Sequence, residues 1–148
     1  MERSSGDNVR KRASELTKQL RSSEDPGEWR RLAAELIPVL TEYWDVHPHS
    51  AMEMLEYTVH NLTVDLANPL VRTVVLAWRK KPDYSPDAGG AADHCYLSAL
   101  ILSENYDLAE HPWVERVLPS TLRKELNSPR EMRDRERKLA LVRDLQGP

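Results

Sequence analysis

Histidine and carboxylate side chains that could hold a metal ion gather in residues 42–60, EYWDVHPHSAMEMLEYTVH. This stretch contains three of the five histidines and no Lys or Arg. Imidazole nitrogens and carboxylate oxygens bind zinc and similar ions, so one interpretation is a metal-dependent helical enzyme. The candidate ligands are Asp45, His47, His49, Glu56 and His60.

The same stretch also fits the corner between two helices, and we favour that interpretation. The two histidines on either side of Pro48 match none of the well-specified zinc spacings. The proline restricts the residue before it to an extended backbone, and Ser50 followed by Glu53 has the spacing of a capping box. We therefore predict an interhelical turn at residues 47–50, with Ser50 as the helix cap and no bound cofactor.

Other catalytic chemistry has little support in the sequence. Cys95 is the only cysteine, which excludes an internal disulfide and a zinc site built on cysteine pairs. Its neighbour His94 would point about 100° away on a helix, so it cannot act as a base for the thiol unaided. The five glycines form neither a dinucleotide-binding fingerprint nor a P-loop. We therefore favour a protein that is not an enzyme.

Charge is strongly segregated along the chain, although the net charge is only −3. Residues 1–23 hold six basic and three acidic side chains, whereas residues 41–68 hold five acids and no Lys or Arg. Residues 86–115 add six acids without a base. Patches of one sign steer partners more than they determine a fold. The predicted function is a protein–protein interaction module (an adaptor, inhibitor or regulatory subunit) whose acidic surface meets a basic partner.

Candidate contact residues come from the acidic stretch and from the last helix. In that helix the arginines alternate with acidic residues at pairing distance, which weakens phosphate binding because the cations are neutralised. A nucleic-acid-binding regulator is therefore the alternative function, and we expect the terminal helices to mediate self-association. The candidate partner-binding residues are Glu42, Asp45, Glu53, Glu56, Arg130, Arg133, Arg137, Leu139 and Val142.

Apolar spacing predicts an all-α fold, a compact bundle of six to eight helices, with a short solenoid-like stack as the alternative. Stripes spaced three and four residues apart run over residues 9–20 and over residues 55–66, which is typical of amphipathic helices. We expect one domain: an amphipathic N-terminal helix over residues 1–24, a helical core over 25–126 and a charged C-terminal helix over 127–148.

Two further segments bear on the fold. Residues 70–78, LVRTVVLAW, are rich in β-branched residues, but a lone strand lacks a partner, so we predict a helix that begins at Pro69. Residues 91–104 are apolar nearly all round, which predicts an enclosed central helix. No apolar run reaches the roughly 18 residues of a membrane span, and no secretory signal is visible. We therefore expect a soluble, cytoplasmic protein.

Overall fold

The computed structural model describes residues 2–60, 62–85 and 91–109, and all structural statements below concern these residues. Every regular element in this part of the chain is helical, and none is a strand, which confirms the all-α prediction. The helices predicted beyond residue 109, including the one over 127–148, lie outside it. The elements are α1 (Glu2–Ser22), α2 (Pro26–Val46), α3 (Pro48–Val59), α4 (Val64–Arg79), α5 (Ala91–Leu102) and the 3₁₀ turn η1 (Tyr106–Leu108).

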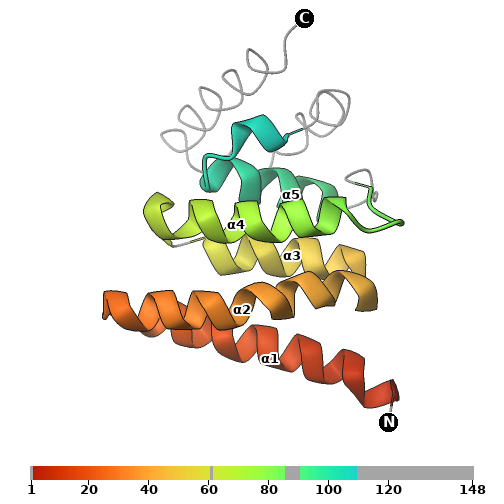
Figure 1. Cartoon of the computed structure of the whole chain (residues 1–148), viewed down its shortest axis with the longest axis horizontal. Coiled ribbons are helices and arrows are strands. Elements are labelled where there is room, and N and C mark those ends of the chain that lie inside the picture. The colour runs from red at the N-terminus through yellow and green to blue at the C-terminus, as the bar shows by residue number, and fades with distance from the viewer. Residues whose placement is uncertain (1, 61, 86–90, 110–148) are drawn as a thin grey trace, which may run out of the picture.

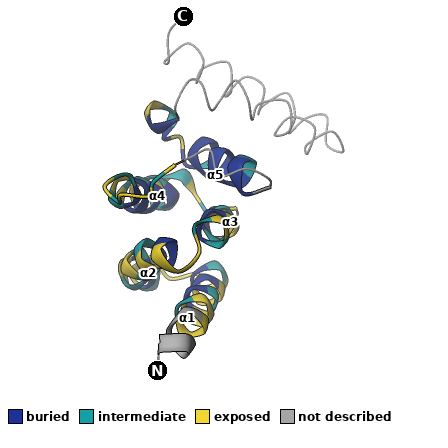
Figure 2. Cartoon of the chain, turned by 90° about the vertical axis from the view of Figure 1, so that its right-hand side faces the viewer, coloured by how far each residue is buried: buried dark blue, intermediate teal, exposed yellow. Residues whose placement is uncertain are grey.

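The helices form two layers (Figures 1 and 2). Helices α1, α3 and α5 make one layer, here called the odd layer, and α2 and α4 make the other, the even layer. Each helix packs on its neighbour in sequence, and α3 also packs on α5 and α2 on α4. Figure 2 shows that the buried residues lie mainly where the helices face one another. Each layer therefore presents its own outer surface.

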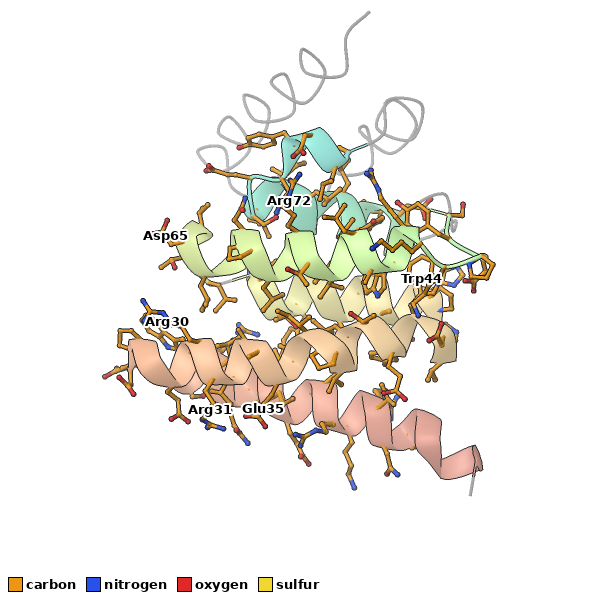
Figure 3. The ribbon with its side chains drawn as sticks, viewed as in Figure 1. Arg30, Arg31, Glu35, Trp44, Asp65 and Arg72 are labelled. Carbon is orange, nitrogen blue, oxygen red and sulfur yellow. The ribbon has the colours of Figure 1, made fainter. Side chains whose placement is uncertain are left out.

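Aromatic side chains fill the core near the C-terminal ends of α2 and α4. Trp78 lies against Trp44, with ring centroids 5.1 Å apart, and against Tyr96, at 5.9 Å. Both indole nitrogens have acceptors 3.1 Å away, the Leu40 carbonyl for Trp78 and the Asp83 carboxylate for Trp44. Figure 3 labels Trp44. Buried Trp needs such partners because an unpaired N–H is costly away from water. The cluster joins α2, α4 and α5.

The turn between α2 and α3 is confirmed, but it is shorter than predicted. His47 alone links the two helices, with the extended backbone expected before a proline (φ −161°, ψ 100°). The prediction that Ser50 caps the helix is wrong, because α3 begins two residues earlier at Pro48. The His47 Nδ1 atom accepts a hydrogen bond from the Ser50 backbone N–H at 3.1 Å. Imidazole thus replaces the hydroxyl as the cap.

Two prolines and one apolar stripe show where the helices run. Pro38 lies inside α2 without splitting it. The apolar stripe over residues 55–66 does not belong to one helix, because α3 ends at Val59 and α4 begins at Val64. The predicted helix over 70–78 is confirmed, but Pro69 does not begin it and lies inside α4. Pro69 lies beyond the first turn, where proline removes one i→i−4 backbone hydrogen bond and crowds the carbonyl of residue i−4, so α4 forms despite a local cost.

The enclosed central helix is confirmed as α5, which is buried from Ala92 to Ile101 except at the half-buried His94. Its C-terminus forms a Schellman motif. The Asn105 N–H binds the Leu100 carbonyl at 2.9 Å, and the Glu104 N–H binds the Ile101 carbonyl at 3.1 Å. This geometry places Glu104 in the left-handed region, with φ 58°, where a side chain is strained.

We predict that Glu104→Gly stabilises the protein by about 1 kcal/mol, because glycine adopts the left-handed conformation without strain. The matched control is Glu53→Gly in the interior of α3, which should destabilise by about 1 kcal/mol. Urea unfolding followed by circular dichroism measures both. Destabilisation by Glu104→Gly would show that the backbone at this position carries no strain.

A polar clamp joins the end of α5 to α4. The Asn105 amide donates to the Asn68 carbonyl at 3.1 Å, and the Asn68 amide donates to the Ser103 carbonyl at 2.8 Å. Arg72, labelled in Figure 3, forms an ion pair with Asp107 at 2.9 Å. The hydrogen bond from Arg72 lowers the pKa of the Asp107 carboxyl below its ordinary value. The clamp fixes the polypeptide that follows α5.

The lowered pKa of Asp107 makes its contribution to stability depend on pH. A carboxyl whose pKa is lower in the folded state stabilises the fold above its unfolded pKa of about 3.9, and that stabilisation disappears as the pH falls through the folded pKa. We predict that Asp107→Asn is slightly less stable than wild type at pH 7 and equally stable well below pH 3. The effect is small because Asp107 and Arg72 are about half exposed. Thermal unfolding across this range checks it, and a pH-independent difference would refute it.

Candidate interaction surface

The candidate metal ligands are divided between three places. The rings of His47 and His49 lie 5.6 Å apart at the start of α3. Glu56 and His60 face each other at 3.7 Å at its far end, and the twelve residues of α3 rise roughly 18 Å. The third place is Asp45 on α2, whose carboxylate forms an ion pair with Lys81.

The Lys81 ammonium binds both carboxylate oxygens of Asp45 at 2.8 and 2.9 Å. Within the described residues no three His, Cys, Asp or Glu side chains are placed to hold a metal ion. Cys95 is buried in α5 among core residues. The geometry therefore lends no support to a metal-dependent enzyme or a thiol nucleophile.

The acidic candidates for partner binding lie on both layers. Glu42 and Asp45 are exposed on α2 of the even layer, and Glu53 is exposed on α3 of the odd layer. The Glu56 side chain is only 19% exposed. The 42–60 stretch therefore does not present its carboxylates on one helix. The remaining candidates, Arg130, Arg133, Arg137, Leu139 and Val142, lie outside the described residues, and their role stays a prediction.

The sequence gives little sign of a seam between α1 and α3 on the odd layer. The hydroxyls of Thr17 and Thr58 meet there at 2.9 Å, and both residues are fully buried. Because the Thr58 hydroxyl donates its only hydrogen to the Met54 carbonyl at 2.8 Å, the Thr17 hydroxyl is the donor to Thr58. One turn further along α1, the Arg21 guanidinium lies 4.6 Å from the centre of the Tyr57 ring. Both contacts use the C-terminal half of α1.

Towards the N-terminal half of α1 the seam opens into a cleft of about 540 Å³. Figure 1 shows this end of α1 descending away from the other helices. Among the described lining residues, half-buried Met54 lies on α3 and the others lie on α1. The described lining residues are Asp7, Asn8, Arg10, Lys11, Ser14 and Met54.

A smaller hollow of about 130 Å³ lies past the Arg21–Tyr57 contact, at the other end of the seam. Half-buried Trp29, Leu62 and Leu66 give it an apolar lining. The Trp29 indole N–H donates to the Ser23 carbonyl at 2.6 Å. This contact holds the ring in place.

Four cations lie along the seam. Arg10 and Lys11 line the cleft, and Lys18 lies two turns beyond Lys11 on the same helix face. Arg21 follows at the Tyr57 contact. None of these four cations forms an ion pair within the part of the chain that the structure describes.

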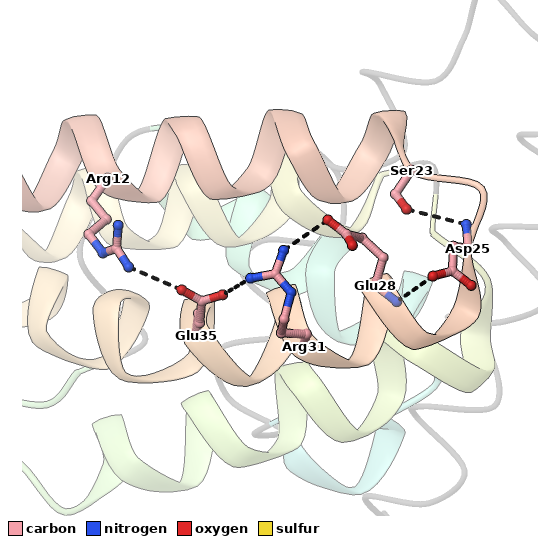
Figure 4. A network of polar contacts seen from close by, with 6 residues as sticks. All are labelled: Arg12, Ser23, Asp25, Glu28, Arg31 and Glu35. Carbon is pink, nitrogen blue, oxygen red and sulfur yellow. Dashed lines mark hydrogen bonds and ion pairs between the residues drawn. The ribbon is translucent and has the colours of Figure 1, made fainter.

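The opposite side of α1 shows the contrast. There Arg12 pairs with Glu35 at 3.3 Å, and Arg31 pairs with Glu35 at 2.6 Å and with Glu28 at 2.8 Å (Figure 4). The Asp25 side chain accepts a hydrogen bond from the Glu28 N–H and so caps the start of α2. Within the described residues, ion pairs therefore balance the charge where α1 meets α2, whereas along the α1–α3 seam the four cations outnumber Asp7 and Glu15. The run of basic residues in 1–23 was the visible signal, but the sequence could not tell these two sides apart.

Tyr57 is the exposed aromatic residue of the seam. It is 41% exposed, and the other large exposed hydrophobic residues of the described chain are Val46 and Leu76 on the even layer. The Arg21 guanidinium restrains the ring through a cation–π contact. Tyr and Arg are among the residue types enriched at energetically important protein contacts.

Comparison with known proteins supplies no functional inference, because no protein family, curated protein or solved structure matches this chain. Across the described residues, no helix combines the length and apolar character needed to cross a membrane. The functional proposal therefore depends on the chemistry of the α1–α3 seam.

Proposed function

We propose that this protein is a non-enzymatic interaction module, acting as an adaptor, inhibitor or regulatory subunit. Its contact surface is the outer side of α1 and α3, here called the α1–α3 face. The observation that supports this most directly is exposed Tyr57, held by Arg21 beside a cleft whose cations form no ion pair within the described residues. A restrained aromatic side chain loses little conformational entropy on binding, which favours affinity.

Residues of opposite charge also border this face. Glu53 lies four residues before Tyr57, so both side chains project from the same side of α3. It is exposed and forms no ion pair within the described residues. The predicted contact between an acidic surface and a basic partner is therefore proposed here for Glu53. Contacts of both signs would fix the orientation of a partner more than they would raise its affinity.

A photo-crosslinking amino acid in place of Tyr57 tests the proposal in cells of the source organism. We expect a discrete crosslinked product that excess unlabelled wild-type protein competes away, because residue 57 touches the partner. Leu76 is the matched control, since it is similarly exposed (39%) but lies on the even layer.

The readout is gel mobility followed by mass spectrometry of the crosslinked band. Crosslinking from Leu76 but not from Tyr57 would place the contact on the even layer and reject the α1–α3 face. Identical products from both positions would show random collision.

A further inference from the structure

We infer that the cleft between α1 and α3 binds an acidic segment of a partner protein, anchored by an apolar side chain. This inference rests on the proposed function and names the chemistry of the partner at that face. It assigns the cations of α1 to carboxylate binding and Met54 to the apolar contact.

The charge of the cleft and its surroundings selects an acidic partner. Arg10 and Lys11 line the cleft with one carboxylate, Asp7. Lys18 and Arg21 continue the cations along α1, with exposed Glu15 between Lys11 and Lys18 on the same face, so cations exceed acids on this side of the helix by four to two. Arg binds carboxylates through two parallel hydrogen bonds, and Lys adds a mobile positive charge. Because these cations have no carboxylate partner within the described residues, a bound acidic segment would not have to displace an internal ion pair.

The cleft also offers an apolar contact between the charges. Met54 is half-buried on the α3 side and packs against the core. Its flexible thioether side chain adapts to apolar groups of different shapes, as in other binding surfaces rich in methionine. A volume of about 540 Å³ accommodates several side chains. The partner segment therefore carries at least one large apolar residue among its acids.

The same observations favour an acidic protein segment over a nucleic acid. Phosphate binding depends on many unopposed cations, whereas Asp7 lies in this cleft and Glu53 stands exposed on the neighbouring helix. The net charge of −3 weighs more heavily against a long nucleic acid, which carries a phosphate at every nucleotide, than against a short segment that brings only a few carboxylates. Met54 would give a phosphate backbone no useful contact.

Fluorescence anisotropy with the full chain tests this inference directly. The probe is a short fluorescein-labelled peptide of Asp and Glu with two central leucines, and the comparison peptide has serines in place of the leucines. We expect the leucine peptide to bind more tightly, with affinity that falls as salt rises, because its charged contacts are screened.

Charge-reversal variants locate the binding site. Lys11→Glu should weaken the peptide at least about fivefold, whereas Arg30→Glu, an equal change in net charge on exposed α2 of the even layer, should leave it nearly unchanged. Lys18→Glu should act like Lys11→Glu, and uncharged Met54→Gln should erase the preference for leucine over serine. Circular dichroism confirms that each variant is folded.

Several outcomes would overturn the inference. Equal weakening by Lys11→Glu and Arg30→Glu would indicate only general attraction. Tighter binding of single-stranded DNA than of the peptide, sensitive to Lys11→Glu, would make the cleft a nucleic-acid site. Binding of an unlabelled second copy of the chain, lost in Lys11→Glu, would make the occupant another protomer. Absence of peptide binding while Tyr57 still crosslinks a partner would reject the acidic segment and leave the proposed function standing.

Discussion

The hydroxyl pair of Thr17 and Thr58 is the contact on which the α1–α3 face depends. Helix α1 packs along α2 through an apolar stripe, and such contacts are not directional. The hydrogen bond between the two buried hydroxyls is directional, and it fixes the C-terminal half of α1 against α3. Leaving either hydroxyl unpaired in the core costs about 1–3 kcal/mol. This pair therefore determines where the helices meet and where the cleft between them opens.

Charge follows the same division of α1 into two sides. The side towards α2 is neutralised by the ion pairs of Arg12, Glu35 and Arg31. Exposed ion pairs of this kind add little stability each, but they occupy the cations. On the side towards α3, Lys11 and Lys18 form no ion pair with any residue that the structure describes. One helix thus supports the fold with one face and presents positive charge with the other.

The local features of the fold could be predicted from the sequence, whereas the arrangement of charges in space could not. The cap at Asp25 and the enclosure of α5 both depend on spacing within a few residues, and the predicted enclosure of α5 is confirmed. The apolar residues keep their helical spacing across the break between α3 and α4, so this break was not predicted. The cap at His47 was not predicted, because the Ser50 hydroxyl three residues later matches the usual capping-box spacing with Glu53.

The contacts of the candidate site could not be predicted from the sequence, because they join residues that are far apart in the chain. Asp45 is paired with Lys81, which lies 36 positions away in the chain, so no local pattern could assign its partner. The placing of Glu42 and Glu53 on different layers follows from the single-residue turn at His47. A run of acidic residues in the sequence is therefore not evidence of one acidic surface. The basic residues of α1 were visible in the sequence. Separating Arg12, which pairs with Glu35, from Lys11 and Lys18, which form no ion pair within the described residues, required the positions of α2 and α3.

Amide hydrogen exchange of α1 in two variants of the hydroxyl pair tests the central claim most directly. Thr58→Val removes the acceptor of the Thr17 hydroxyl, whereas Thr17→Val leaves Thr58 its bond to the Met54 carbonyl. If the pair fixes α1 against α3, exchange in α1 accelerates in both variants and more in Thr58→Val, while α4 and α5 keep their protection. Unchanged exchange in α1 would mean that α2 alone holds this helix, and the cleft would then not be a fixed feature of the protein.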